Sequence, residues 1–436
     1  MKIKQWLTFY LIKFKKFNTR ETANMKKTIV VLATLDTKEF EVEYLKNLIE
    51  TKGFLTIVID TGILDSSRVK ADIPKENVAE AGGTSLKDLI ESEFYRKEID
   101  RAYTMNVIIK GAILICKKLH SAEKLHGLIS LGGSSGTTIG ISVMKELPIG
   151  IPKLMVTTRP EFTDEGDITI MQAPVDILGL NKLIKNTLAL AAGAITGMVD
   201  IDLQDNEIKP AIGITSLGVT TQAVMKIKSL LEKRGMELIV FHNRTKILEK
   251  LIEEDLVNGI IDLTPNELVK IFIMKTLIDR KDRLEIAGQR GLPQIIVPGG
   301  LDMLIFSTQD SVKQQSAFIS LKDRKWCDHG PYVRLIRTNA KENEILGKIV
   351  AERANRARGP IAVVIPMKGF SARDKIGEVF YNQEIDKSFI KTLKFYAQKN
   401  VDILEINAHI NDDIFAKEIV NIYITLLKKQ IKENWD

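Results

Sequence analysis

The chain carries one pattern of apolar strands and helices twice. In each copy a strand leads into a helical pattern that ends with a basic residue and a glycine, and further strands follow. Lys27 and Gly53 are separated by the same number of residues as Lys209 and Gly235. Matches in the same order predict two copies of one α/β unit. The matched segments, first copy against second, are 27–31 and 209–214, 52–59 and 234–241, 127–131 and 259–263, and 150–156 and 291–297.

The strands of both copies are continuous apolar runs, which is typical of strands covered on both faces. Helical patterns separate them, so we expect parallel strands joined by right-handed crossovers. The predicted fold class is α/β, with two doubly wound parallel-sheet domains of similar design. An apolar helix at 183–198 and a polar stretch at 200–209 mark the boundary. We therefore expect an amino-terminal domain at 25–200 and a carboxyl-terminal domain at 208–436, the latter extended by strands at 360–365 and 401–406.

The formal net charge of +7 is concentrated at the amino end. Residues 1–24 carry six basic side chains and one acid, a net +5 that leaves only +2 for the rest. A globular part so close to neutrality gives no electrostatic argument for a nucleic-acid partner. The apolar run 6–12 is too short to span a bilayer, and no small-residue cleavage site follows it. Because Met25 directly precedes the first strand, we interpret residues 1–24 as a disordered leader or an upstream start. A basic interfacial helix is the alternative.

The cysteine content fits a reducing compartment. Cys116 and Cys327 can form neither a disulfide framework nor a zinc ligand set. No other segment approaches transmembrane length. We expect reduced cysteines, a cytoplasmic location and no membrane partner.

A loop rich in glycine and hydroxyl groups follows the strand at 127–131. A helix is expected after the loop, from Thr138 to Lys145. The loop therefore lies between the carboxyl end of a parallel strand and the start of a helix, where its free N–H groups suit a phosphate or a carboxylate. The alternative is a tight turn with hydroxyl caps. It is not a Walker loop, because no lysine follows Gly136 until Lys145. The candidate binding residues here are Gly132, Gly133, Ser134, Ser135, Gly136 and Thr137.

Polar residues also follow the first strand of each copy, where a ligand of an open α/β sheet would lie. Asp36 is a candidate metal ligand through Mg²⁺ or water, and Thr37 and Lys38 are candidate phosphate contacts. The alternative for this loop is a helix cap with Lys38 solvated. In the second copy Thr220 and Thr221 suit either phosphate contacts or an N-cap pair.

Later strand ends of the second copy supply acids and a histidine. Asp302 follows two glycines and is a candidate for a metal or a ribose, and Asp412 is a further metal candidate. His409 is a candidate for general acid–base chemistry, a structural role being the alternative.

These strand ends together resemble a largely uncharacterised family that is widespread in bacteria and archaea. That family also forms the amino-terminal, ATP-binding part of the tomato protein that confers resistance to tomato mosaic virus. The resemblance covers residues 26 to 425. The segments that carry it are 31–38 (VLATLDTK), 131–133 (LGG), 152–156 (PKLMV), 218–221 (GVTT), 298–303 (PGGLDM) and 409–412 (HIND).

The resemblance implies two Rossmann-like domains, a homodimer, and ATP or a related nucleotide as ligand, but no reaction. The sequence departs from the family pattern at two positions that matter here. Glu39 stands where relatives usually have glycine, and Ser135 replaces a glycine of the Gly-Gly-Ser-Gly-Gly-Thr loop.

Two functions remain open from the sequence. In the first, the protein binds ATP or a related phosphorylated ligand in a cleft at the strand carboxyl ends, with Mg²⁺ as a candidate cofactor. In the second, it is an enzyme for a small phosphorylated or carboxylated metabolite, with His409 and either Asp36 or Asp302 as acid–base or metal groups. A structural or interaction protein with a vestigial pocket is a third reading.

Overall fold

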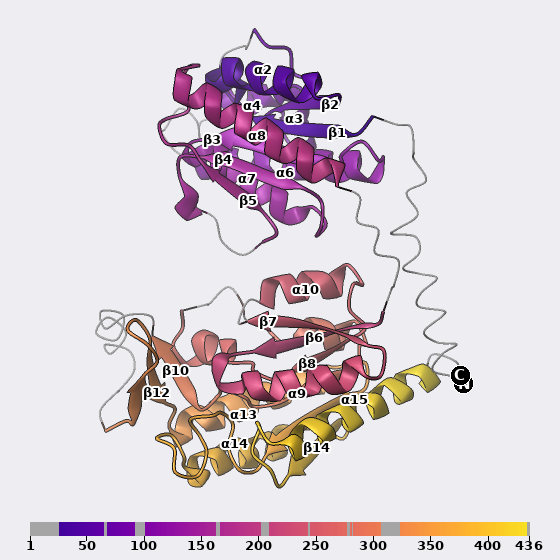
Figure 1. Cartoon of the computed structure of the whole chain (residues 1–436), viewed down its shortest axis with the longest axis vertical. Helices are drawn as coiled ribbons and strands as arrows, with labels where there is room; N and C mark the ends of the chain where they lie inside the picture. Colours follow the sequence, from indigo (N-terminus) through magenta and orange to yellow (C-terminus); the bar gives the residue numbers. More distant parts are fainter. Residues whose placement is uncertain are drawn as a thin grey trace. The chain divides into compact units, whose positions relative to one another are not determined.

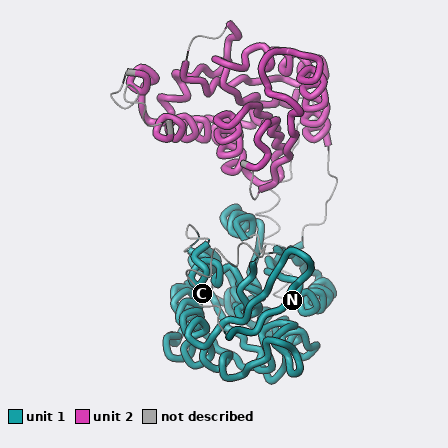
Figure 2. Tube along the Cα trace, turned by 90° about the vertical axis from the view of Figure 1, so that its left-hand side faces the viewer, with its two compact units in different colours: residues 1–18, 206–436 teal, residues 19–205 magenta. Residues whose placement is uncertain are grey.

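The computed structural model describes residues 26–64, 68–91, 101–162, 166–201, 209–242, 245–276, 280, 282–306 and 323–433. The predicted leader, residues 1–24, lies outside these ranges, as does most of the predicted boundary segment 200–209. Contacts divide the chain into two compact units that join between residues 205 and 206 (Figure 2).

The amino-terminal unit contains one five-stranded parallel sheet with the strand order β2-β1-β3-β4-β5 (Figure 1). Its strands are β1 (Thr28–Ala33), β2 (Leu55–Asp60), β3 (Gly127–Gly132), β4 (Lys153–Thr157) and β5 (Thr169–Gln172). Its helices are α2 (Leu35–Thr51), α3 (Lys75–Gly82), α4 (Leu86–Glu91), α6 (Arg101–Ser121), α7 (Ser134–Glu146) and α8 (Lys182–Asp200), with a 3₁₀ turn at Pro160–Phe162.

Alternate residues of the interior strand β1 point to opposite faces, and each face has its own core. Ile29 and Val31 pack with α2 and α8, whereas Val30 and Leu32 pack with α3, α4, α6 and α7. The sheet is therefore covered on both sides, which is why its strands are apolar throughout. Its order is that of a doubly wound sheet whose direction of winding reverses between β1 and β3.

The carboxyl-terminal unit contains a six-stranded parallel sheet with the order β14-β13-β9-β8-β6-β7. Its strands are β6 (Ala211–Ser216), β7 (Glu237–His242), β8 (Gly259–Asp262), β9 (Gln294–Ile296), β13 (Ile361–Pro366) and β14 (Val401–Ile406). The helical segments are η2 (Gly218–Thr220), α9 (Thr221–Glu232), α10 (Thr245–Glu253), η3 (Val269–Ile273), α11 (Glu285–Gln289), α13 (Ala340–Asn355), α14 (Gln383–Tyr396) and α15 (Asp413–Glu433).

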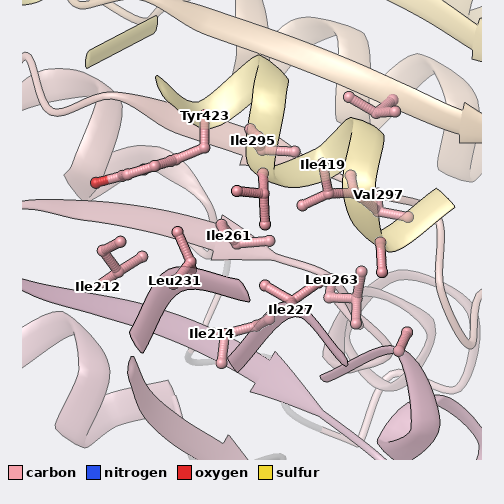
Figure 3. Close-up of a cluster of buried hydrophobic side chains, with 14 of the residues drawn as sticks. Ile212, Ile214, Ile227, Leu231, Ile261, Leu263, Ile295, Val297, Ile419 and Tyr423 are labelled. Carbon is pink, nitrogen blue, oxygen red and sulfur yellow. The ribbon is translucent and has the colours of Figure 1, made fainter. Parts of the chain in front are cut away.

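One face of this sheet is covered by α9 and α15. Figure 3 shows side chains from the strands, such as Ile212 and Ile261, in one cluster with Ile227 of α9 and Ile419 of α15. The opposite face packs against α13 and α14.

The predicted fold class is confirmed: both units are doubly wound parallel sheets of Rossmann-like design. Strands β1 to β4 and strands β6 to β9 occupy the same positions in their sheets, in the order second, first, third, fourth. These strands fall in the segments that the sequence matched in pairs, so the repeat in the sequence is a repeat of topology.

Two local features differ from the sequence-based expectation. Helix α7 begins at Ser134 rather than at Thr138. Its first turn contains Ser134, Ser135 and Gly136, whose low helix propensity is the reason that the sequence predicted a later start. A second sheet, antiparallel and three-stranded, joins β10 (Met303–Phe306), β12 (Arg334–Arg337) and β11 (Trp326–Asp328). Its residues Met303 and Leu335 pack on Leu217 and Val219, next to the carboxyl end of β6.

Candidate functional site

The glycine loop lies at the carboxyl end of β3, and its glycines serve two purposes. A Cβ on Gly132 would lie 2.8 Å from the Cα of Gly136, and a Cβ on Gly140 would lie 2.5 Å from Ser130 Oγ. These glycines let α7 pack closely against the strand that precedes it. Gly133 is different, since a Cβ there would meet only Thr158 Oγ1, at 3.9 Å. Gly133 therefore borders open space.

The first turn of α7 presents main-chain donors on the surface. Ser134 and Ser135 are exposed, and Gly133 is half-buried. The N–H groups in the first turn of a helix have no acceptor within the helix, and the first backbone bond of this turn runs from Thr137 N to Gly133 O. The helix dipole adds positive potential at the same place. The arrangement can accept an anion without a charged side chain.

Thr137 anchors this turn and is not available to a ligand. It is fully buried, and its hydroxyl lies 2.6 Å from Thr157 Oγ1 at the end of β4. Thr157 Oγ1 in turn accepts a hydrogen bond from Arg159 N. Of the six loop candidates, Gly133, Ser134 and Ser135 lie at the surface, whereas Gly132, Gly136 and Thr137 are buried.

The loop after β1 lies beside the glycine loop, because β1 pairs with β3 in parallel register. Thr37 N and Lys38 N both donate to Thr34 O, and Lys38 has the non-helical torsion angles φ −131° and ψ 19°. The regular part of α2 thus starts after a separate turn that carries exposed Thr37 and half-buried Lys38. This places two of the predicted phosphate contacts at the sheet edge that holds Gly133.

Asp36 faces the loop after β2 and does not cap α2. Its Oδ2 accepts hydrogen bonds from Ile63 N and Leu64 N, both at 3.1 Å. Asp60, at the end of β2, accepts from Leu35 N at 3.0 Å and Gly62 N at 2.8 Å. Burial raises the pKa of the Asp60 carboxyl. Sequence reasoning missed Asp60, although an acid directly after an apolar strand was the available signal.

The predicted candidates Thr220 and Thr221 of the second unit make local bonds. Thr220 is fully buried, and its hydroxyl lies 2.7 Å from Thr264 Oγ1 and 3.0 Å from Leu217 O. Thr221 Oγ1 also donates to Leu217 O. Their positions favour the helix-start role that the sequence left open.

Asp302, Ser371 and His409 meet at the carboxyl ends of β9, β13 and β14. Asp302 is fully buried, and its Oδ2 accepts a hydrogen bond of 2.6 Å from Ser371 Oγ. His409 Nε2 lies 2.8 Å from Ser371 O, while Nδ1 accepts from Asn411 N. An Nδ1 that accepts leaves the proton on Nε2, so the ring is a neutral cross-link between two loops. Burial lowers the pKa of His409, in keeping with this form.

The guanidinium of Arg337 and two further buried carboxyls, Asp374 and Asp386, lie next to this cluster. Arg337 Nη2 pairs with Asp386 at 2.5 Å and lies 3.6 Å from Asp374 Oδ1. Its Nη1 donates to the main-chain oxygen of Asp302. Burial raises the pKa of Asp302 to about 6 and that of Asp374 to about 9, the latter helped by the neighbouring Asp386 and Asp302. Burial and the neighbouring carboxyls therefore favour the protonated form of Asp374.

The predicted metal ligands do not form a cluster. Within the described ranges, no three His, Cys, Asp or Glu side chains converge in a way that could hold a metal ion. Asp412 uses its Oδ2 to accept a hydrogen bond from His409 N. Any metal at these sites would need most of its ligands from elsewhere.

Two doubly wound parallel-sheet units define the class: an α/β protein of Rossmann-like design. The chain belongs to the uncharacterised protein family UPF0261. The amino-terminal domain of that family matches residues 27–204, and its carboxyl-terminal domain matches residues 209–427.

Relatives extend across bacteria and into a plant. A UPF0261 protein of Clostridium tetani is 40% identical over 416 residues, covering 93% of this chain and all of the relative. A UPF0261 protein of Mesorhizobium japonicum is 31% identical over 407 residues, covering 90% of this chain and 98% of the relative. The ToMV resistance protein Tm-1(GCR237) of Solanum lycopersicum is 29% identical over 345 residues, covering 76% of this chain and 45% of the tomato protein. The suspected relation is therefore confirmed.

A solved structure, the UDP-GlcNAc 2-epimerase of Neisseria meningitidis bound to UDP-GlcNAc, matches over 92% of this chain and all of the epimerase. The sequence identity is 11% and the TM-score is 0.19, so the match carries no argument about function. Among the helices that the structure describes, none is long and apolar enough to cross a membrane.

Proposed function

We propose that the amino-terminal unit binds ATP or a related nucleotide with its phosphates at the first turn of α7. The observation that carries this is the open space beside Gly133, which adjoins the exposed residues Ser134 and Ser135 at the point where the winding of the sheet reverses. Ligands of doubly wound sheets bind at that point. Thr37 and Lys38 on the neighbouring loop supply a hydroxyl and a positive charge.

Mg²⁺ fits this site as a companion of the nucleotide rather than as a resident ion. Mg²⁺ commonly takes one or two carboxylates together with substrate phosphates. Asp36 is the candidate carboxylate. Its Oδ2 is held by Ile63 N and Leu64 N, so Oδ1 is the oxygen that would face a metal.

The enzyme alternative has less support. Both ring nitrogens of His409 are engaged by main-chain groups, and Asp302 is fully buried. A general acid or base must reach the proton that it transfers. We therefore propose ligand binding and no reaction.

A homodimer is part of the same proposal, with the outer face of α8 as its interface. Leu183, Leu190 and Ile201 along this face are 52%, 59% and 62% exposed, and a Cβ on Gly193 or Gly197 would meet nothing within 4 Å. Glycine inside a helix costs about 1 kcal/mol relative to alanine. A second helix that approaches this face closely would explain why it carries two glycines.

The charges of α8 favour a second copy in antiparallel orientation. Lys182 begins the helix and Asp200 ends it, which is the reverse of what the helix dipole prefers. A two-fold axis at the level of residue 191, midway between the two, would bring Lys182 toward Asp200 of the partner subunit. We also propose a cytoplasmic location, since Cys116 and Cys327 are both free.

Calorimetric titration with a ligand series tests the nucleotide proposal. ATP, ADP and inorganic triphosphate are expected to bind, adenosine more weakly, because the phosphates make the proposed contacts. Ser135→Asp separates binding from folding. A carboxylate at a helix start stabilises the helix but repels phosphate, so the variant should melt no lower than the parent and lose ATP binding. Ser135→Ala is the neutral control, and equal ATP affinity in Ser135→Asp would contradict the proposed site.

A further inference from the structure

The loop after β2 borders the proposed site and is held by acidic side chains. Three successive N–H groups of this loop donate to carboxylates. Gly62 N donates to Asp60 Oδ1 at 2.8 Å, whereas Ile63 N and Leu64 N donate to Asp36 Oδ2. Successive N–H groups that point the same way form an anion-binding concavity, which these carboxylates fill.

Asp60 also reaches the loop after β1. The same Oδ1 atom accepts a 3.0 Å hydrogen bond from Leu35 N, and the side chain is only 6% exposed. One buried oxygen therefore joins the two loops. Gly62 makes this possible, since a Cβ there would lie 2.8 Å from Asp36 Oδ2 and 3.1 Å from Asp60 Oδ1.

The turn that this oxygen holds carries the candidate phosphate contacts. Thr34, at the start of the turn, makes no side-chain cap bond to α2, and Lys38 lies outside helical geometry. The contacts to Asp36 and Asp60 therefore fix a turn that the helix itself does not cap.

We propose that Asp60 is a positioning residue for anion binding, holding the Thr34–Lys38 turn so that Thr37 and Lys38 face a ligand at Gly133. The inference rests on the proposed function and adds to it a residue that touches no ligand. Both of its hydrogen bonds go to Oδ1, so the proposed role requires an accepting oxygen rather than a net charge.

The variants Asp60→Asn and Asp60→Ala distinguish a role of the accepting oxygen from a role of the charge. In Asp60→Asn the amide oxygen can accept both N–H groups, so the Kd for ATP and for inorganic triphosphate should stay within about twofold of the parent. In Asp60→Ala both bonds are lost, and the Kd should rise about tenfold, or about 1.4 kcal/mol. Asp72→Ala is the matched control. Asp72 accepts one main-chain bond, from Val58 N, and belongs to the same connection but not to the turn. It should leave the Kd unchanged.

Hydrogen exchange of peptides that cover residues 34–38 gives a readout that needs no ligand. Exchange there should be faster in Asp60→Ala than in Asp60→Asn or Asp72→Ala. If the parent binds ATP and Asp60→Ala binds it equally well, the positioning role is wrong while the site stands. If the Kd rises as much in Asp60→Asn as in Asp60→Ala, the effect comes from the charge of Asp60, and the proposed positioning role is wrong. If the parent binds neither ATP nor triphosphate, the proposed function itself fails, and the positioning role with it.

Discussion

The hydroxyl groups of Thr137 and Thr157 lie 2.6 Å apart and join the first turn of α7 to the end of β4. The pair is fully buried, so the start of the helix is fixed to the sheet from below. Above it, Gly133 and the two serines remain open. A rigid base under exposed donors is what a preorganised anion site requires.

The glycines beneath the loop are expected to matter for folding. Gly132→Val would place a Cβ 2.8 Å from the Cα of Gly136, where only backbone is available to move. Overpacking of this kind costs about 1–3 kcal/mol. Thermal denaturation should therefore show a lower melting temperature of the amino-terminal unit. A variant as stable as the parent would mean that α7 does not pack against its strand in this way.

The repeat of apolar segments was enough to predict two parallel, doubly wound sheets, because the alternation of apolar strands and helical patterns extends over dozens of residues. The details that depend on distant contacts were not predictable. Nothing in the local sequence indicates that Asp60 turns back to Leu35 N, or that both nitrogens of His409 are engaged. The antiparallel sheet was missed because its strands have only three or four residues.

A substitution of Asp36 tests whether this carboxylate binds Mg²⁺ together with ATP. Asparagine in Asp36→Asn keeps an oxygen for Ile63 N and Leu64 N but removes the charge. If Oδ1 binds Mg²⁺, ATP affinity measured by calorimetry should fall about tenfold with Mg²⁺ and stay unchanged without it. An equal affinity in both conditions would remove Asp36 from the list of metal ligands.

The pH dependence of stability should reflect Asp374. Its folded pKa of about 9 lies above the value of 3.8 for a free aspartate. The folded state thus holds a proton that the unfolded state releases, and stability is lost as the pH rises from about 4 to about 9. Asp374→Asn cannot release that proton. Its melting temperature should exceed that of the parent at pH 8 to 9, with the advantage shrinking toward pH 5. If the melting temperatures of the two proteins change with pH in the same way, the raised pKa of Asp374 is contradicted.

The α8 interface predicts a specific loss of association. Leu190 is 59% exposed, so Leu190→Glu should not unfold the chain. Placing the carboxylate in an apolar helix pair should produce monomers in analytical ultracentrifugation. Met225→Glu on α9, where the native side chain is 60% exposed, is the control and should sediment like the parent. If Leu190→Glu dimerises with the same affinity as the parent, the interface does not lie on α8.

The central claim, that an anion binds at the first turn of α7, is tested most directly by Gly133→Val. Gly133 has φ −83° and ψ −149°, outside the left-handed region that favours glycine, and an added Cβ meets no atom closer than 3.9 Å, so the variant should melt within a few degrees of the parent. The same side chain would cover the exposed N–H groups. Calorimetry with ATP should then show binding to the parent and none to the variant, at equal folded content. Unchanged ATP affinity in a folded Gly133→Val protein would contradict the account.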